Sequence, residues 1–330
     1  MNPNSEFWKQ KPVFITGATG LLGSTLTKYL VDAGADVVVL VRDEVPQSRF
    51  IELGLAEKVT TVHGDLTDYS LLQRVMHEYE IDTVFHLAAQ TIVGTAERGP
   101  LGTFETNIRG TYFLLEACRQ NPLLKRVVVA SSDKAYGEQK DLPYNEETPL
   151  QGRSPYDVSK SCADLLCSSY YFTYNLPVCV TRCGNFFGPG DLNYSRIIPG
   201  TIRSLHQDKA PVIRSNGQYV RDYIFVDDGA LAYIELAEKM LEKNLAGQAF
   251  NFSYGLKMTV LDVVNAVAKA MDKSQLKPKI LNEAGKEIPQ QYLSSEKAKE
   301  ILGWKPTFNF EQGLKETIRW YISKWKHQKN

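Results

Sequence analysis

Short apolar runs alternate with helix-length amphipathic segments through the first half of the chain. Nearly continuous runs of Val, Leu and Ile are typical of strands buried on both faces, and a helix between successive strands indicates a parallel sheet. Right-handed crossovers then predict an α/β fold with a doubly wound parallel sheet of the Rossmann type. The predicted strands are Val13–Thr16, Val37–Val41, Val59–Val62, Thr83–Leu87, Arg126–Ala130 and Val178–Arg182. The predicted helices lie near Leu21–Ala33, Asp68–Tyr79, Thr103–Gln120 and Pro155–Tyr174.

The pattern changes after Thr181, where turn-rich and mixed segments replace the regular alternation. A strand followed by a helix that returns to the sheet is predicted near residues 219–243. We therefore expect a large Rossmann domain over residues 1–183 together with 219–243. A smaller, mostly C-terminal α/β domain is expected over residues 184–218 and 244–330.

The composition excludes several classes of protein. The 330 residues are 43% hydrophobic, with 38 Lys and Arg against 38 Asp and Glu. A chain without net charge lacks the basic surplus that nucleic-acid binding requires, so no nucleic-acid partner is expected. No apolar run approaches the ~20 residues needed to span a membrane, and the first residues lack a signal-peptide core. The five cysteines form no Cys-x-x-Cys pair and the five histidines lack metal-ligand spacing, which favours reduced thiols, a cytoplasmic location and no metal site.

The first predicted strand runs directly into a glycine-rich turn that opens the first predicted helix. Glycines at such a turn let backbone N–H groups and the helix N-terminus approach a pyrophosphate, which predicts a dinucleotide site. The spacing is Gly-x-x-Gly-x-x-Gly. The residues assigned to the cofactor in this turn are Gly17, Thr19, Gly20, Leu21, Leu22 and Gly23.

The end of the second strand is expected to contact the adenosine ribose. This strand ends at Val41 rather than at an acidic residue, and Arg42 and Asp43 follow. A guanidinium suits a 2′-phosphate, whereas Asp43 can accept a hydrogen bond from a ribose hydroxyl, so NADP is favoured and NAD stays open. Past the third and fourth strands, further cofactor contacts are assigned to Asp65, Leu66, Leu87, Ala88 and Ala89.

A tyrosine and a lysine share one face of the helix predicted from Pro155 onward, because Tyr156 and Lys160 are four positions apart. A phenol with a pKa of about 10 is a poor base at neutral pH, and a neighbouring ammonium group lowers that pKa by stabilising the phenolate. The pair is therefore predicted to abstract a proton, and both residues are also assigned to the cofactor site.

Several segments resemble the extended short-chain dehydrogenase/reductase family. They are TGATGLLG, GDLTD, HLAAQ, the Ser131–Ser132 strand end, YDVSK and RCGNFFGPG, in the family's order over essentially the whole chain. The resemblance implies an enzyme that acts on a nucleotide sugar, as a 4-epimerase, 4,6-dehydratase, decarboxylase or reductase. For a 4,6-dehydratase, it also implies a tightly bound nicotinamide cofactor that is regenerated in each cycle of a redox-neutral reaction.

The residues after Ser131 narrow this choice. The 4,6-dehydratases of the family carry an acid followed by a base at this point, because eliminating water across C5–C6 removes one proton and supplies another. The resemblance thus implies Asp133 as the acid and Lys134 as the base. Ser132 is expected to contact the C4 hydroxyl of the sugar beside Tyr156.

The Asp-Lys pair and the Phe7-Trp8-x-x-Lys11 opening resemble CDP-glucose 4,6-dehydratases, and an enzyme of that type is the leading interpretation. Arg42-Asp43-Glu44 resembles inverting UDP-N-acetylglucosamine 4,6-dehydratases, which rank second because their tyrosine lies much closer to the Asp-Lys pair. A 4-epimerase, a reductase that consumes NADPH and a cofactor-binding regulatory protein without turnover are the other interpretations.

The resemblance further implies where a nucleotide diphosphate hexose is held. Asn185 matches the asparagine that holds the diphosphate, and Tyr292 matches a region near the ribose. Arg214 and Arg221 suit phosphate oxygens, although an Arg221–Asp222 ion pair is an alternative. Gln90 completes the assigned substrate contacts. Family members commonly dimerise through the helices near Thr103–Gln120 and Pro155–Tyr174, so a homodimer is expected.

Overall fold

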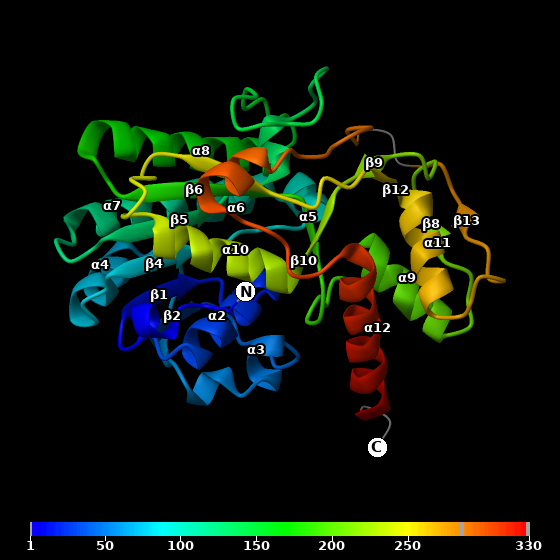
Figure 1. Cartoon of the computed structure of the whole chain (residues 1–330), viewed down its shortest axis with the longest axis horizontal. Coiled ribbons are helices and arrows are strands. Elements are labelled where there is room, and N and C mark those ends of the chain that lie inside the picture. Colours follow the sequence, from blue (N-terminus) through cyan, green and yellow to red (C-terminus); the bar gives the residue numbers. More distant parts are fainter. Residues whose placement is uncertain (1, 284–286, 328–330) are drawn as a thin grey trace.

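A seven-stranded parallel sheet forms the centre of the molecule, in the strand order β11-β6-β5-β4-β1-β2-β3 (Figure 1). The computed structural model describes residues 2–283 and 287–327. The strands are β1 (Pro12–Thr16), β2 (Asp36–Val41), β3 (Thr60–His63), β4 (Thr83–His86), β5 (Arg126–Ala130), β6 (Val178–Cys183) and β11 (Ala249–Phe252). All six strands expected from the sequence lie in this sheet, which confirms the Rossmann-type fold. The strand order reverses between β1 and β4, and a ligand crevice forms at such a switch point, outside the carboxyl ends of the strands.

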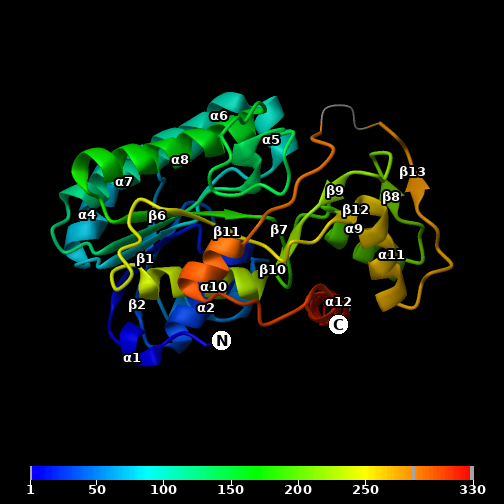
Figure 2. The ribbon, with the colours of Figure 1, turned by 45° about the horizontal axis from the view of Figure 1, so that its top comes forward.

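Helices cover both faces of the sheet (Figure 2). Because side chains alternate along a strand, Val13 and Ile15 of β1 enter one apolar cluster and Phe14 enters the opposite one. The first face is covered by α2 (Leu21–Asp32) and α10 (Val226–Lys239), and the second by α4 (Tyr69–Glu78), α7 (Gly110–Gln120) and α8 (Pro155–Tyr174). The helix predicted near Thr103–Gln120 is divided into α6 (Pro100–Phe104), a π-helical turn η2 (Glu105–Arg109) and α7.

A smaller lobe has its own apolar core, which includes Phe187, Ile202, Val267 and Tyr321. Its helices are α9 (Ile197–His206), α11 (Val260–Ala270) and α12 (Phe310–His327). Its strands form three pairs: β7 (Asn185–Phe187) with β10 (Tyr223–Phe225), β9 (Val220–Arg221) with β12 (Met258–Thr259), and β8 (Val212–Ile213) with β13 (Lys279–Ile280).

The remaining elements are short. They are α1 (Ser5–Trp8), α3 (Arg49–Glu52), η1 (Leu55–Glu57), α5 (Val93–Arg98), η3 (Asp133–Tyr136) and η4 (Ala298–Leu302). No helix within the described residues has the length and apolarity required to cross a membrane.

The strand and helix expected near residues 219–243 are present as β10 and α10, and the helix packs on the Rossmann layer as expected. β10 pairs with β7 outside the main sheet, whereas the helix that follows it, α10, packs against α2 as part of the Rossmann layer. The seventh strand of the sheet is instead β11, which pairs with β6. β11 lies outside the strands predicted from the sequence, because Ala249-Phe250-Asn251-Phe252 lacks the continuous Val, Leu and Ile run of the other strands.

Candidate functional site

Most of the candidate residues lie at one edge of the sheet. The glycine turn follows β1, Arg42 follows β2, Asp65 follows β3, Leu87 follows β4 and Ser132 follows β5. Since the strands are parallel, these five carboxyl ends meet at the same edge (Figure 1). This edge is where open α/β sheets bind ligands.

The glycine turn brings the backbone of β1 against that of β4. Gly17 has a φ of +78°, and a Cβ there would lie 2.7 to 2.9 Å from backbone atoms of Leu87 and Ala88. A Cβ on Gly23 would lie 2.0 Å from the Gly17 carbonyl oxygen. Gly20 caps α2 without a side-chain hydrogen bond, so the helix N-terminus stays open for an anion. Thr19, Leu21 and Leu22 lie in the same junction between strand and helix.

A buried histidine that sequence reasoning did not select holds the end of β4 in place. His86 Nδ1 lies 2.7 Å from Thr16 Oγ1, and its Nε2 lies 3.0 Å from Thr111 Oγ1. Burial lowers the pKa of His86 to about 3, so the ring is neutral. Thr16 Oγ1 also accepts a hydrogen bond from the Ala88 N–H at 3.2 Å. This chain of contacts fixes Leu87–Ala88 against Gly17, where the dinucleotide is expected.

The proposed ribose-reading residues form an ion pair with each other. Arg42 Nε lies 2.7 Å from Asp43 Oδ2, and both side chains are more than half exposed, at 59% and 67%. Asp65 lies 4.0 Å from the same guanidinium. Partial burial acts to raise the pKa of Asp65, but hydrogen bonds from Thr67 outweigh it, so the pKa of Asp65 is lowered. The guanidinium of Arg42 is therefore already balanced by carboxylates, which weakens the argument for a 2′-phosphate.

Asn107 is a second residue that sequence reasoning missed, and it anchors Gln90. Its Oδ1 accepts from the Gln90 N–H at 2.7 Å, and its Nδ2 donates to the Gln90 carbonyl at 3.1 Å. The same Nδ2 donates to Ser159 Oγ on α8 at 2.9 Å. Asn107 lies in the π-helical turn η2, a feature often found at functional sites but not visible in hydrophobic periodicity.

The tyrosine and lysine of α8 face different partners. Lys160 Nζ donates to the Ala130 carbonyl at the end of β5, at 2.8 Å, and burial lowers its pKa to about 8. Burial raises the pKa of Tyr156 to about 12, although a hydrogen bond with the Ser132 hydroxyl opposes this change. This direction differs from the expected lowering by Lys160, because desolvation of the phenolate dominates in this arrangement.

Ser132, Asp133 and Lys134 lie together directly after β5. Ser132 Oγ accepts from the Lys134 N–H at 3.2 Å and donates to Asp133 Oδ1 at 3.0 Å. Lys134 Nζ lies 3.4 Å from both oxygens of Asp133, which is 2% exposed. Its other partner is Gln291, whose Oε1 accepts from Nζ at 2.5 Å and which sequence reasoning also missed. The structure thus brings an acid, an amine and the hydroxyl groups of Ser132 and Tyr156 into one cluster.

Arg221 lies buried on β9 and does not pair with Asp222. Its Nη2 lies 3.1 Å from Glu287, and its Nη1 donates to the Val220 carbonyl at 2.9 Å. Asp222 accepts instead from the backbone N–H groups of Tyr223, Leu256 and Leu293. Burial raises the pKa of Asp222 to about 6 despite these hydrogen bonds.

The other substrate candidates are spread around the smaller lobe. Asn185 Nδ2 donates to the Asp222 carbonyl at 3.1 Å. Arg214 is exposed and donates to the Ser195 carbonyl, and the Tyr292 ring packs under Lys257. Among the described contacts, none joins Arg214 or the Tyr292 ring to the cluster of Ser132, Asp133, Lys134 and Tyr156. Burial raises the pKa of Tyr156, and the positive charge of Arg196, a residue not predicted from the sequence, acts in the opposite direction.

The Phe-Trp opening lies at the other end of the sheet, before the first residue of β1. Trp8 is fully buried and donates to Glu238 at 2.6 Å, and Phe7 packs against Arg126 at the start of β5. This motif anchors the N-terminus under the amino edge of the sheet. Its resemblance to CDP-glucose 4,6-dehydratases therefore rests on packing at this edge, away from the carboxyl ends of the strands.

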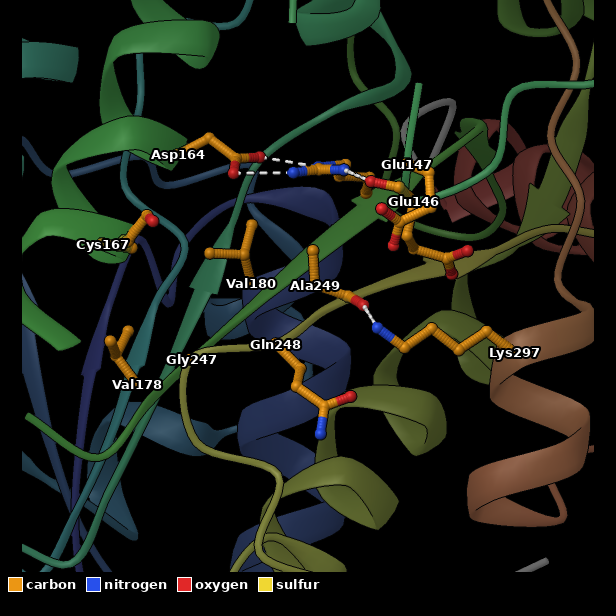
Figure 3. A pocket seen from close by; sticks show the side chains of 12 residues that line it. Glu146, Glu147, Asp164, Cys167, Val178, Val180, Gly247, Gln248, Ala249 and Lys297 are labelled. Carbon is orange, nitrogen blue, oxygen red and sulfur yellow. Dashed lines mark hydrogen bonds and ion pairs between the residues drawn. The ribbon is translucent and has the colours of Figure 1, made fainter. Parts of the chain in front are cut away.

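A cavity of about 260 Å³ lies between α8, β6 and β11 (Figure 3). On its wall, Arg182 forms a two-pronged ion pair with Asp164, at 2.7 and 2.8 Å. The same guanidinium donates to Tyr136 Oη at 3.0 Å. Lys297 donates to the Ala249 carbonyl on the opposite wall. Arg182 therefore connects α8, which carries Tyr156 and Lys160, to the η3 turn that carries Asp133 and Lys134.

Comparisons with known proteins agree with this geometry. A family model described as GDP-mannose 4,6 dehydratase matches residues 14–317. The dTDP-glucose 4,6-dehydratase 1 of Escherichia coli (strain K12) is 30% identical over 95% of this chain and 94% of its own length. The CDP-glucose 4,6-dehydratase of Salmonella typhimurium is 29% identical, over 96% of this chain and 92% of its own.

Solved structures give the same picture. A dTDP-glucose 4,6-dehydratase from Bacillus anthracis in complex with NAD has a TM-score of 0.85 and 27% identity, and the match covers 96% of this chain and 98% of that one. A UDP-glucose 4-epimerase from Thermotoga maritima has a TM-score of 0.86 and 27% identity, with 95% and 99% covered. None of these matches supports the preference for NADP.

The fold and the glycine turn define an extended short-chain dehydrogenase/reductase. Within that class, the chain belongs to the GDP-mannose 4,6 dehydratase family and is an enzyme of the dehydratase type.

Proposed function

We propose that this enzyme converts an NDP-hexose to the NDP-4-keto-6-deoxyhexose, with CDP-glucose as the leading substrate. The observation that carries the proposal is the Asp133–Lys134 pair, which lies at the carboxyl end of β5 next to Ser132. An epimerase needs no acid–amine pair at this place, whereas elimination of water across C5–C6 needs both. The identities to dTDP-glucose and CDP-glucose dehydratases are comparable. They therefore support the type of reaction more strongly than they support one nucleobase in the substrate.

The cofactor proposed is NAD. The cradle that a Cβ would fill at Gly17 and Gly23, the open N-terminus of α2 and the buried ammonium of Lys160 fit a nicotinamide dinucleotide. The pairing of Arg42 with Asp43 favours NAD over NADP. When bound, the nicotinamide would accept hydride from C4 of the sugar and return it at C6.

Tyr156 is proposed to take the proton of the C4 hydroxyl, with Ser132 hydrogen-bonded to the same oxygen. Ser132 and Arg196 both favour the phenolate of Tyr156, against burial. Lys160 is held by the Ala130 carbonyl at the edge where the nicotinamide ribose is expected. Its charge is available there to stabilise the phenolate once the substrate excludes water from the site.

The elimination is assigned to Lys134 and Asp133. The C5 proton goes to Lys134 Nζ, the C5–H electron pair forms the C5–C6 double bond, and the C6 oxygen leaves as water with a proton from Asp133. Transfer of one proton across the 3.4 Å between the two side chains converts the ion pair into a neutral acid and a neutral amine. This transfer changes no net charge, so the largely buried pair can reach its competent form without exchanging ions with solvent.

The nucleotide is proposed to lie against the smaller lobe, expected over residues 184–218 and 244–330. Asn185 and the buried Arg221 are the proposed diphosphate contacts, with Arg214, Gln90 and Tyr292 as further substrate contacts. Arg221 is the stronger candidate of the two arginines, because Arg214 is exposed.

A homodimer through α7 and α8 is also proposed. The two helices lie side by side on one face of the molecule (Figure 2). They expose the large apolar side chains Tyr112, Leu165 and Phe172, the last of them at 87%. Burial of these groups against a second copy is favourable.

The five free cysteines are consistent with the proposed cytoplasmic location.

The proposed function is tested by removing the amine. The enzyme is incubated with CDP-glucose, and in parallel with dTDP-glucose, UDP-glucose and GDP-mannose, without added reductant. Lys134→Met is expected to slow formation of the 4-keto-6-deoxy product by roughly 10²- to 10⁴-fold. The exposed Lys140→Met serves as the matched control and should leave the rate unchanged. Unchanged dehydration in Lys134→Met would remove Lys134 from the mechanism.

A 4-epimerase is the second candidate, and the match to the Thermotoga enzyme favours it. In that case Asp133 and Lys134 would only support the turn after β5. The wild-type enzyme would then form the C4 epimer of the hexose, and Lys134→Met would change folding stability rather than the product.

A further inference from the structure

We propose that Gln291 is the positioning residue for Lys134, and that it holds the amine in both of its protonation states during the elimination. Its Oε1 accepts a hydrogen bond from Lys134 Nζ at 2.5 Å, across 157 positions of the chain. Within the described residues, Lys134 Nζ donates to the two carboxylate oxygens of Asp133 and to this amide oxygen. The inference rests on the proposed role of Lys134 as the base.

Backbone contacts on both sides hold Gln291 in place. Its N–H donates to the Val220 carbonyl at 3.1 Å, next to Arg221 on β9. The following two residues are tied as well, because the Tyr292 carbonyl accepts from the Tyr144 N–H and the Leu293 N–H donates to Asp222. Gln291 itself is 1% exposed. The segment leading into η4 returns from the smaller lobe to the sheet (Figure 2), so the amide reaches Lys134 from the lobe proposed to bind the nucleotide.

A neutral acceptor suits a lysine that must change its protonation state. A carboxylate at this position would stabilise the ammonium form and oppose its conversion to a base, whereas an amide oxygen accepts from an ammonium and from an amine alike. Other charged and titratable groups also face this region. They are Asp133 on η3, Asp157 and Tyr156 on α8, Tyr144 in the loop after η3, and Arg221 and Asp222 at β9. Asp133 and Asp157 already place two carboxylates near Nζ, so a third would shift the balance further towards the ammonium.

The first variant is Gln291→Met, which keeps the length of the side chain and removes the acceptor. Its matched control is Gln290→Met, the same change on the exposed neighbour. With CDP-glucose deuterated at C4 or at C5, Gln291→Met is expected to gain a primary deuterium isotope effect at C5 and none at C4. The reason is that removal of the C5 proton becomes rate-limiting while oxidation at C4 is untouched. The expected loss in kcat is roughly 10- to 100-fold, with little change in KM.

The second variant, Gln291→Glu, tests the neutrality of the acceptor. The ascending limb of the pH–rate profile is expected to move to higher pH, by roughly one unit, because the added carboxylate raises the pKa with which the doubly protonated Asp133–Lys134 pair loses its first proton. A residue with a merely structural role would lower the rate at every pH without moving this limb.

The outcomes separate the inference from the function on which it rests. Equal slowing of the C4 and C5 steps in Gln291→Met, or an unmoved pH profile in Gln291→Glu, overturns the positioning role alone. The proposed dehydratase function then stands on the wild-type product. A wild-type enzyme that yields no 4-keto-6-deoxy sugar from any of the four nucleotide hexoses overturns both. A selective isotope effect at C5 together with a shifted pH limb supports the assignment.

Discussion

The half of the sheet edge proposed to bind the cofactor (the cofactor half) and the half proposed to be catalytic (the catalytic half) are built by different means. Around the dinucleotide site, the shape comes from the backbone: Gly17 and Gly23 let chain segments approach more closely than any side chain would allow. Around the catalytic cluster, the shape comes from buried charged and polar side chains, such as Asp133, Asp222 and Arg182. A methyl group should therefore damage the first region, whereas a change of charge at constant size should damage the second.

The largest effect is expected from an isosteric loss of charge in the ion pair that connects α8 to η3. Asp164→Asn leaves the buried guanidinium of Arg182 without its carboxylate, and such a change costs about 3–5 kcal/mol of unfolding free energy. The exposed pair Arg319–Glu316 provides the control, where Glu316→Gln should cost only about 0–1 kcal/mol. Urea unfolding measures the free energy of unfolding of both variants. Similar losses in the two would contradict the proposed difference between buried and exposed charges.

A smaller but still large effect is expected from one methyl group in the cofactor half. Gly17→Ala places a Cβ within 2.9 Å of the backbone of Leu87 and Ala88, which should cost roughly 3 kcal/mol and weaken NAD binding. Gly54 has a similar left-handed φ of +61° with nothing within 4 Å of its Cβ position. Gly54→Ala should therefore cost only about 1 kcal/mol and leave NAD affinity unchanged. Calorimetry with and without NAD distinguishes the two, and equal losses would show that space at Gly17 is unimportant.

The catalytic half should also respond to pH through Asp222. Burial raises the pKa of Asp222 to about 6, above its usual value of 3.8. Folding therefore favours the protonated form of Asp222. Its contribution to the free energy of unfolding is complete below about pH 4 and is lost as the pH rises through about 6. Between these values, the stability advantage of the wild type over Asp222→Asn should fall by roughly 2–3 kcal/mol. Unfolding in urea at several pH values tests this, and an advantage that grows with pH would contradict the sign.

The smallest effect is expected at Arg42, where a side chain rather than the backbone is the expected contact to the cofactor. The guanidinium of Arg42 is exposed and already paired with Asp43, so Arg42→Ala should change NAD affinity by no more than roughly fivefold. Titration with NAD and with NADP measures this. The contrary outcome is a wild type that binds NADP more tightly than NAD, with Arg42→Ala weakening the binding of NADP alone. That result would restore the preference for NADP inferred from the sequence.

The same contrast explains which features could be predicted from the sequence. Six strands of the sheet and the glycine turn were predictable, because periodicity and glycine spacing report directly on the backbone. β11 was missed because its apolar run is interrupted by Asn251. Gln291 was missed because its partner lies 157 positions away, and no local pattern encodes such a contact.

Two interpretations of local motifs changed once the structure placed them. The Phe7-Trp8 opening matched a family pattern, yet it packs at the edge of the sheet opposite the ligand site. Tyr156 and Lys160 share a helix face, as their spacing indicated, but Lys160 donates to the end of β5 and burial controls the tyrosine. Spacing predicts which side chains share a face, whereas the depth of burial decides their protonation.

The central claim is that Asp133 and Lys134 remove water across C5–C6 after oxidation at C4. It is tested most directly by locating deuterium in the product formed in D₂O. The wild-type enzyme is incubated with the four nucleotide hexoses, without added reductant, and the products are examined by NMR. The expected product is a 4-keto-6-deoxy sugar that carries solvent deuterium at C5. A C4-epimeric hexose without solvent label would contradict the claim and identify the protein as an epimerase.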